Sequence, residues 1–288
     1  MEPIASMSDS GTLFIVATPI GNLDDITLRA IEILKSVDLI AAEDTRHSKV
    51  LLQRIQVDTP LVSYHDFSTE QASRKIIEEL LSGKSIALIS DAGTPLISDP
   101  GYRLVSQARA NDIAVIPIPG PSAVTAALSV AGIPTDRFAF EGFLPNKSAA
   151  RLARLRELKD EARSLVFYES THRIFSSIED MQSVYGPERL LFVGRELTKK
   201  FESHFKGTIP DCLLWLQKDE NAQKGEFVIV VAGCDAATTQ DELLQEALQL
   251  VTKLLPHMPL KTAVALACDI TGAKKNALYQ LALALESS

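Results

Sequence analysis

Short apolar runs alternate with amphipathic stretches along the first 120 residues of the chain. The apolar runs are rich in β-branched residues and predict strands, whereas the stretches between them have the spacing of apolar positions that is typical of helices. Because strands separated by helices need crossover connections, the alternation predicts a mostly parallel sheet. We expect strands near 13–18, 38–43, 61–65, 85–90 and 114–118, and helices near 25–36, 45–55, 69–82 and 101–111.

A second α/β unit follows, and it begins with a helix at Pro121. The apolar runs 190–197 and 201–208 lie too close together for a crossover helix between them, so this spacing predicts a hairpin and a mixed sheet. The strands of this unit are expected near 137–143, 164–169, 190–197, 201–208 and 226–232. The predicted fold is therefore two α/β domains, the first with a mostly parallel sheet and the second with a mixed sheet, with a ligand cleft between them.

After Gly233 the strand signals end and the chain becomes rich in Leu and Ala at helical spacing. Two short helices, near 260–270 and 274–281, flank a glycine-bearing turn, which predicts a helix-turn-helix extension. Its lysines, Lys261, Lys274 and Lys275, favour contact with RNA over the alternative of a helical cap that only buries apolar surface. We divide the chain into a flexible tail (1–11), an N-terminal domain (12–120), a C-terminal α/β domain (121–235) and a helical RNA-binding extension (236–288).

Composition narrows the class of protein. A chain of 288 residues with 46% hydrophobic residues can bury sizeable cores. It contains no run of roughly 18 apolar residues and no signal-peptide pattern, so we expect a cytosolic protein with no membrane partner. Its net charge of −8 argues against nonspecific coating of nucleic acid, although a local basic patch remains compatible with RNA binding. The three cysteines are scattered and predict neither a disulfide framework nor a zinc site.

Three loops that follow predicted strands combine glycine with proline, at residues 18–23 (first loop), 90–101 (second loop) and 119–123 (third loop). Glycine lets a backbone approach a ligand closely, and proline stiffens a loop. Since the carboxyl ends of parallel strands lie at one edge of a sheet, we expect the three loops to converge on one ligand.

Polar clusters follow other strands, at residues 43–47, 168–173, 195–199 and 224–226. Each mixes acids with bases where charged groups can meet a ligand without being buried in a core. Thr45, and Ser170 or Thr171, are also plausible N-caps of the helices that follow. The sequence lacks the common phosphate-loop, dinucleotide, zinc-protease and serine-hydrolase motifs, and its five histidines share no ligand spacing, so we expect a metal-free reaction.

Taken together, these motifs closely resemble the ribosomal RNA small subunit methyltransferase I family. That family belongs to the tetrapyrrole-methylase-like, or class III, S-adenosylmethionine-dependent methyltransferases. The resemblance extends from about residue 12 to the end of the chain. The matching motifs are TPIGNL (18–23), AEDTR (42–46), SDAGTP (90–95), PGPSA (119–123), FYESTHR (167–173), RELTK (195–199) and KGE (224–226).

The resemblance implies 2′-O-methylation of a cytidine in the decoding region of 16S rRNA, in the small ribosomal subunit, by a homodimer with S-adenosyl-L-methionine bound between the two α/β domains. It places Asp91, Gly93, Thr94 and Pro95 on the methionine side of that cofactor, and Ser122, Ala123, Phe167 and Tyr168 near its adenosine. The first loop departs from the G-x-G-P-G-D pattern of tetrapyrrole methylases, so it contacts either the cofactor or the RNA.

Methyl transfer to a ribose hydroxyl needs a group that takes the hydroxyl proton, and carboxylates and neutral histidines can do so. The candidates are Glu43, Asp44, His47, Glu169 and His172. Cationic side chains are expected to hold RNA phosphate, namely Arg46, Arg173, Arg195, Lys199, Lys261, Lys274 and Lys275. The three arginines are alternatively expected to hold the carboxylate of the cofactor. Two alternatives remain open: a tetrapyrrole methyltransferase that acts on a ring carbon, and a non-catalytic RNA-binding assembly factor.

Overall fold

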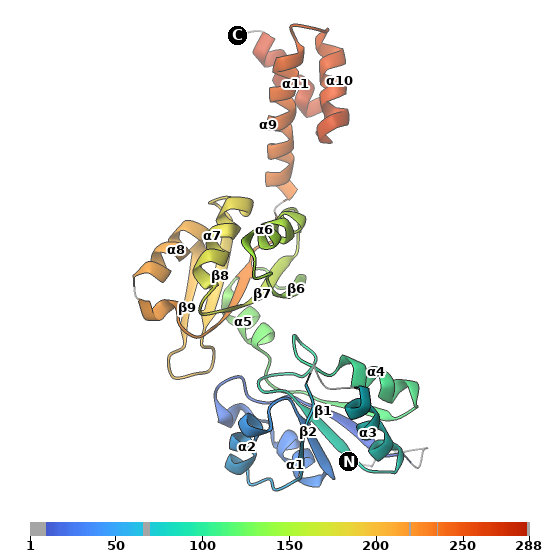
Figure 1. Cartoon of the computed structure of the whole chain (residues 1–288). Helices are drawn as coiled ribbons and strands as arrows, with labels where there is room; N and C mark the ends of the chain where they lie inside the picture. The colour runs from blue at the N-terminus through green and yellow to red at the C-terminus, as the bar shows by residue number, and fades with distance from the viewer. Residues whose placement is uncertain (1–9, 66–69, 219, 235, 287–288) are drawn as a thin grey trace.

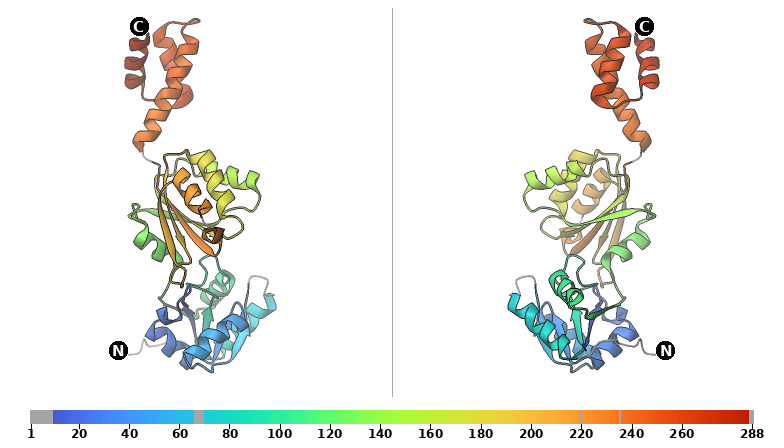
Figure 2. Two further views of the ribbon diagram at one scale, coloured as in Figure 1. Left: turned by 90° about the vertical axis from the view of Figure 1, so that its left-hand side faces the viewer. Right: turned by 90° about the vertical axis from the view of Figure 1, so that its right-hand side faces the viewer.

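The computed structural model describes residues 10–65, 70–218, 220–234 and 236–286. The chain forms two α/β lobes and a helical bundle, arranged end to end with the N-terminus in the first lobe and the C-terminus in the bundle (Figure 1). The side views in Figure 2 show the same elongated order, with the second lobe between the other two parts. The predicted N-terminal tail falls almost entirely on residues 1–9, outside the described residues.

The first lobe contains a five-stranded sheet in the order β3-β2-β4-β1-β5, and its strand pairs are parallel. This confirms the parallel sheet that the alternating pattern predicted. The strands are β1 (Thr12–Val16), β2 (Leu39–Ala42), β3 (Leu61–Ser63), β4 (Ile86–Ile89) and β5 (Ala114–Ile118). The helices are η1 (Leu23–Asp25), α1 (Leu28–Ser36), α2 (Thr45–Arg54), α3 (Glu70–Leu81) and α4 (Tyr102–Ala110).

Helices cover both faces of this sheet, and the sequence of the central strand shows why. All four residues of β4 are buried; Leu88 packs with α3 and α4, whereas Ile89 packs with α1 and α2. A strand buried on both faces reads as a continuous apolar run, as residues 86–89 do. The sheet edge where β1, β4 and β5 end faces the second lobe (Figure 1).

The second lobe contains a mixed sheet in the order β6-β7-β10-β8-β9. The β6–β7 pair is parallel, and the other pairs are antiparallel, which confirms both the mixed sheet and the β8–β9 hairpin. The strands are β6 (Phe138–Phe143), β7 (Ser164–Ser170), β8 (Leu190–Arg195), β9 (Ser203–Thr208) and β10 (Glu226–Val231). The helices are α5 (Ala123–Ala131), α6 (Ser148–Glu157), α7 (Ile174–Tyr185), α8 (Ile209–Gln217) and η2 (Glu220–Gln223).

The two faces of this second sheet have different covers. One face packs against α6, α7 and α8 in a large core that includes Phe167 and Cys212. The other face packs against α5 in a smaller core, which also receives Ile20 from the first loop of the first lobe. A side chain of one lobe therefore belongs to the core of the other, and this contact fixes the first loop beside the second sheet.

The bundle consists of α9 (Ala236–Leu254), α10 (Leu260–Thr271) and α11 (Lys275–Glu286). It has its own core of mostly small residues, among them Val251, Ala267 and Leu278. Gly272 adopts a left-handed conformation (φ 76°) and ends α10, as glycine does at many helix C-termini. The predicted pair of helices around a glycine-bearing turn is confirmed. Among the helices described, none is both long and apolar enough to span a lipid bilayer.

Candidate active site

The three predicted loops meet at the edge of the first sheet and are hydrogen-bonded to one another. The Thr18 backbone N–H donates to the Gly93 carbonyl (2.8 Å), and the Gly93 N–H donates to the Thr18 carbonyl (3.1 Å). The Thr94 hydroxyl donates to the Pro121 carbonyl (3.0 Å), which joins the second loop to the third. The predicted convergence is confirmed, and main-chain groups hold much of it together.

Side chains that pack closely on the loop backbone explain two glycines of these loops. Gly93 has a φ of +85°, and a Cβ atom there would lie 3.3 Å from Ile20 Cγ2. A Cβ atom at Gly120 would lie 2.9 Å from Ala17 Cβ, closer than real Cβ atoms come. Leu96 and Ser98 also have positive φ values, of 74° and 64°. Non-glycine residues in this region of φ are strained, and such strain is concentrated at ligand sites.

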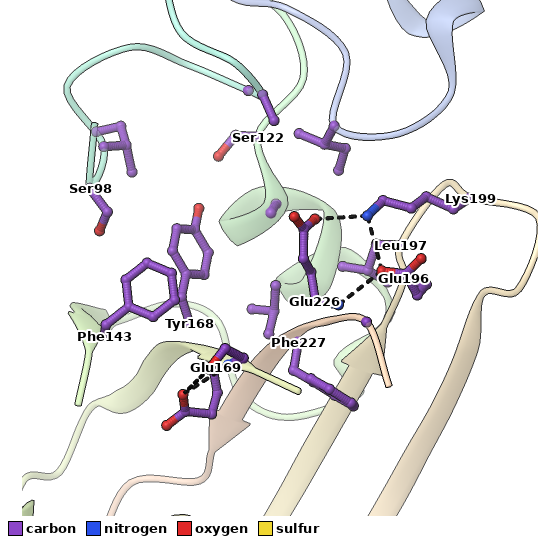
Figure 3. Close-up of a pocket in the computed structure, with 18 of the residues that line it drawn as sticks. Ser98, Ser122, Phe143, Tyr168, Glu169, Glu196, Leu197, Lys199, Glu226 and Phe227 are labelled. Atoms are coloured by element: carbon purple, nitrogen blue, oxygen red, sulfur yellow. Dashed lines mark hydrogen bonds and ion pairs between the residues drawn. The ribbon is translucent and has the colours of Figure 1, made fainter. Parts of the chain in front are cut away.

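A cavity of about 590 Å³ lies between the lobes, and we call it the interlobe cavity. This volume is in the range of small-molecule sites. Figure 3 shows most of the side chains that surround it. The lining residues are Ile20, Ala92, Gly93, Thr94, Ile97, Ser98, Asp99, Ser122, Ala123, Phe143, Tyr168, Glu169, Ser170, Thr171, His172, Glu196, Leu197, Lys199, Gly225, Glu226, Phe227 and Val228.

Aromatic rings form one wall of the interlobe cavity. The Tyr168 ring meets Phe140 edge to face at 4.9 Å between centroids and Phe143 at 5.5 Å. In Figure 3 the Tyr168 hydroxyl points toward the space between Ser98 and Ser122. Burial raises the pKa of Tyr168 to about 12, and the nearby Asp99 charge adds to this rise. The phenol is therefore protonated at neutral pH and presents a neutral ring and a hydroxyl to a ligand.

A lysine with two carboxylates forms the opposite wall (Figure 3). Lys199 Nζ lies 3.0 Å from Glu196 Oε1 and 2.8 Å from Glu226 Oε2. Burial by itself lowers the pKa of Lys199, but the hydrogen bonds from its ammonium to Glu226 and Glu196 outweigh burial and raise the pKa above its usual value. Lys199 is therefore a fixed cation at neutral pH and does not act as a proton acceptor.

The first loop is docked on the segment that carries this lysine. The Asn22 N–H donates to Thr198 Oγ1 (3.1 Å), and Gly21 packs so closely on the Lys199 side chain that a Cβ atom would overlap it. Thr198 and Glu196 have positive φ values of 66° and 51°. The contact between the two lobes thus depends on a glycine in one loop and on a strained turn in the other.

A second cavity of about 230 Å³ lies beside the first, and we call it the side cavity. It shares Ile20, Ala92, Lys199 and Glu226 with the interlobe cavity, so the two spaces adjoin along these residues. Its remaining lining residues are Thr18, Pro19, Gly21, Leu23, His47, Ser48, Val50, Leu51, Ile89, Ser90 and Asp91.

Most of the predicted cofactor residues line the interlobe cavity, but three of them lie elsewhere. Gly93, Thr94, Ser122, Ala123 and Tyr168 line the interlobe cavity. Asp91 lines the side cavity instead, where its Oδ1 accepts a hydrogen bond from the Asp44 N–H (3.0 Å). Pro95 is buried behind the loop surface, and Phe167 lies in the large core of the second lobe because neighbouring strand residues face opposite ways.

The predicted proton acceptors are also separated. His172 and Glu169 line the interlobe cavity and His47 lines the side cavity, whereas Glu43 and Asp44 are absent from both linings. The Glu169 side chain points away from the cavity in Figure 3, and its carboxylate binds Arg173 (2.6 Å) and accepts a hydrogen bond from the Ser177 hydroxyl (2.6 Å). These partners give Glu169 a structural role.

Asp44 is the N-cap of α2, where its carboxylate accepts a hydrogen bond from the Arg46 N–H (2.8 Å). The prediction that Thr45 caps this helix is therefore wrong by one residue. The side chain of Arg46 also binds this carboxylate (2.7 Å), and its hydrogen bonds hold the pKa of Asp44 well below its usual value. The cap predicted at Ser170 or Thr171 is also wrong, because the N-cap of α7 is Arg173. Thr171 instead exchanges hydrogen bonds with the backbone of Gly225 (2.7 and 2.8 Å).

The predicted cations differ in how far they are engaged within the chain. The Arg195 guanidinium donates to the carbonyls of Lys224 (2.6 Å) and Phe201 (2.9 Å), and Arg173 binds Glu169. Both therefore stabilise loops of the second lobe. The Arg46 side chain is 89% exposed beside the side cavity's His47. Three further cations are exposed in the bundle, namely Lys261, Lys274 and Lys275. Figure 1 shows this bundle beyond the second lobe, on the side away from the first lobe.

Among the residues that sequence reasoning did not select, Glu226 is the most informative, because this residue lines both cavities. Its place in the KGE motif was a usable signal. Phe143 carried no such signal in the sequence, since an aromatic residue at a strand end does not show which face of the sheet it occupies. Within the described part of the chain, no three residues of the His, Cys, Asp and Glu types are grouped as a metal site.

Comparisons with known proteins agree with this architecture. The family Tetrapyrrole (Corrin/Porphyrin) Methylases matches residues 12–212, and the RsmI C-terminal HTH domain matches residues 241–286. Among solved structures, the methyltransferase CobJ aligns with a TM-score of 0.58 at 19% identity, covering 78% of this chain and 95% of CobJ. Diphthine synthase also aligns with a TM-score of 0.58, at 14% identity, covering 77% of this chain and 90% of that protein. Fold and site thus define a methylase of the tetrapyrrole methylase class.

Curated relatives resolve the family within that class. Ribosomal RNA small subunit methyltransferase I of Pseudomonas aeruginosa is 50% identical over 95% of this chain and 97% of its own length. The protein of the same name from Escherichia coli O157:H7 is 49% identical over 96% of both chains. This chain belongs to the ribosomal RNA small subunit methyltransferase I family. The predicted family, fold class and S-adenosylmethionine-dependent methyltransferase activity are confirmed.

Proposed function

We propose that this enzyme transfers a methyl group from S-adenosylmethionine to the ribose 2′-hydroxyl of a cytidine in the decoding region of 16S rRNA, within the small ribosomal subunit. The observation that carries the proposal is identity near 50%, over almost the whole chain, to relatives named for methylation of small-subunit ribosomal RNA. The helix-turn-helix bundle with its exposed lysines favours RNA over a tetrapyrrole substrate.

The interlobe cavity fits the cofactor in size and in chemistry. We assign Gly93 and Thr94 to its methionine part, because both line the interlobe cavity and Gly93 presents bare backbone there at a positive φ. We assign Ser122, Ala123 and Tyr168 to its adenosine, for which an aromatic wall provides a stacking surface. When bound, S-adenosylmethionine supplies an electrophilic methyl group on a positively charged sulfur.

The residues shared by the two cavities mark where the ribose meets this methyl group. In the reaction the bond from sulfur to the methyl carbon breaks, the bond from the 2′ oxygen to that carbon forms, and the hydroxyl proton must be accepted. We assign the acceptor role to Glu226, because this residue lines both cavities. Lys199 keeps this carboxylate in place at 2.8 Å beside the two cavities.

The proposed activity is tested by incubating the enzyme with small ribosomal subunits and S-adenosylmethionine labelled in its methyl group. Alkali cleaves RNA through the free 2′-hydroxyl, so a methylated ribose leaves an alkali-stable dinucleotide. We expect the label in one such dinucleotide that contains cytidine. Label in the mononucleotide fraction, or its absence from 16S rRNA, would show that the ribose is not the target.

The role of Glu226 is tested by Glu226→Gln, which keeps the shape of the side chain and removes its basicity. A positioned proton acceptor contributes about 10²- to 10⁴-fold to a rate, so kcat should fall by that range while cofactor affinity is retained. Glu188→Gln makes the same change of side chain and is the matched control, because Glu188 is exposed and lines neither cavity. An unchanged kcat in Glu226→Gln, together with a large loss in His47→Gln, would assign the proton to His47.

Three further expectations belong to the proposal, the first from the resemblance and the other two from the sequence pattern. The working unit is a homodimer, which sedimentation equilibrium tests directly. The enzyme acts in the cytoplasm, where small subunits are assembled. The domain limits are 12–120, 121–235 and 236–288, which limited proteolysis tests through the limits of the stable fragments that it releases.

A further inference from the structure

The side cavity has the form of a small, mostly apolar slot that adjoins the reacting region. Pro19, Leu23, Val50, Leu51 and Ile89 supply apolar surface. Its volume of about 230 Å³ is smaller than that of typical drug-sized ligand sites, which span about 300–1,000 Å³. A flat heterocycle with an attached sugar at the opening suits these dimensions better than a tetrapyrrole does.

Ser48, on α2, gives the side cavity a polar group that the fold itself does not use. Its side chain is 96% buried, and its Oγ is one of two buried side-chain polar atoms without a hydrogen-bond partner among the residues described. Buried hydroxyls in native proteins are nearly always hydrogen-bonded, because leaving one without a partner costs stability. Ser48 lines the side cavity, and a ligand bound there would supply the missing partner once the side chain turns its hydroxyl toward the cavity.

Asp91 provides an acceptor on the same cavity. One of its carboxylate oxygens, Oδ1, accepts the hydrogen bond from the Asp44 N–H. A carboxylate has two oxygens and about four lone-pair sites, so Asp91 retains capacity to accept from a ligand. Carboxylates recognise the N4 amino group of cytosine, a donor that uracil lacks because it has a carbonyl oxygen at that position.

We propose that the side cavity binds the nucleobase of the target nucleotide, with Asp91 accepting from the exocyclic amino group of cytosine and Ser48 bonding to the same base. The inference rests on the proposed function. Enzymes that modify a nucleotide inside a folded RNA must take it out of its stack, and the extruded base then needs a pocket beside the reacting atom. The residues shared by the two cavities place such a pocket next to the cofactor.

The decisive variant is Asp91→Asn. The amide oxygen can still accept from the Asp44 N–H, while the amide NH₂ replaces an acceptor with a donor. The assay compares small subunits reconstituted with cytidine or with uridine at the target position. We expect kcat/KM on the cytidine substrate to fall about 5- to 150-fold, the range for one base contact, and the preference for cytidine over uridine to shrink or reverse.

Two measurements separate this role from a structural one. Asp58→Asn, an exposed residue of the same lobe outside both cavity linings, makes the same change of charge and should leave both substrates unaffected. Ser48→Ala should lower kcat/KM on the cytidine substrate about 5-fold without lowering stability to urea, because the removed hydroxyl has no partner in the free chain.

Cofactor affinity, measured by calorimetry, should be unchanged in Asp91→Asn. A loss of cofactor affinity in that variant would place Asp91 in the cofactor site and overturn the proposal. Unchanged base preference in Asp91→Asn, with wild-type enzyme active on 16S rRNA, would overturn the nucleobase pocket alone. A wild-type enzyme that transfers no methyl group to 16S rRNA would overturn the proposed function and this inference with it.

Discussion

The two lobes build their shared site from different materials. The first lobe contributes main chain: its loops are tied by the paired backbone groups of Thr18 and Gly93, and Gly93 and Gly120 stand where neighbouring side chains pack closely on the loop backbone. The second lobe contributes side chains, with the ring of Tyr168 on one wall and the Lys199 ion pairs on another. The difference teaches that a substitution at a loop glycine of the first lobe should act through shape, and one at Tyr168 or Lys199 of the second lobe through the chemistry of the removed group.

The largest effect is expected from Gly93→Val in the first lobe. Its positive φ and the 3.3 Å approach to Ile20 leave no room for a branched side chain, so cofactor affinity should fall at least about 100-fold. Gly186→Val is the matched control, because Gly186 has a similar φ of +81° and nothing within 4 Å of its Cβ position. Calorimetry on both variants separates backbone strain, which they share, from loss of the site.

In the second lobe, Tyr168→Ala should weaken cofactor binding about 5- to 150-fold, the range for losing one stacked aromatic ring. Tyr168→Phe should retain most of the affinity, because the ring supplies the contact and the phenol is neutral at pH 7. If Tyr168→Phe binds as weakly as Tyr168→Ala, the hydroxyl carries the interaction and the stacking role is wrong.

The bundle offers a third region for the comparison, without a part in either cavity. Lys274→Ala combined with Lys275→Ala should raise the KM for small subunits about 10-fold and reduce its dependence on salt, since each phosphate contact contributes to both. Cofactor affinity and kcat should stay at the wild-type values. An unchanged KM would assign the bundle to packing only.

The smallest expected effect concerns pH. Burial raises the pKa of the Cys212 thiol from 9.0 to about 12. A group whose pKa is higher in the folded state contributes stability below its unfolded pKa, and this contribution is lost as the pH rises from about 9 to 12. Urea unfolding should show a loss of about 1 kcal/mol between pH 9 and pH 10 from this residue. The free energy of unfolding of Cys212→Ala should fall by about 1 kcal/mol less than that of the wild type over the same pH interval. An equal fall in both proteins would contradict the assignment of this pH dependence to the Cys212 thiol.

The sequence predicted the strands and the converging loops because these features depend on local pattern. Period-2 and period-3.6 alternation locates elements, and glycine with proline marks turns after a strand, as at residues 90–101. The resemblance supplied the remaining functional expectations. The structure then showed that the loops divide one cleft into two adjoining cavities, which no local pattern could reveal.

The prediction of the site was limited because a sequence does not show which partner a charged side chain binds. A glutamate beside an arginine looks the same in sequence whether the two bind a ligand or each other, and Glu169 with Arg173 forms a local pair. Phe167 and Tyr168 are adjacent and both aromatic, so their sequence did not show which one faces the cavity. Glu226 gained its position from a strand pairing with distant β8. Such long-range placement is fixed by tertiary packing.

The most direct measurement is a crystal structure of the chain with S-adenosylhomocysteine bound. We predict density for this ligand in the interlobe cavity, with its amino-acid part against Gly93 and its adenosine against Tyr168, and a side cavity still open beside Lys199 and Glu226. Density for the ligand within the side cavity, or outside the space between the lobes, would contradict the division of the site into a cofactor cavity and a nucleotide cavity.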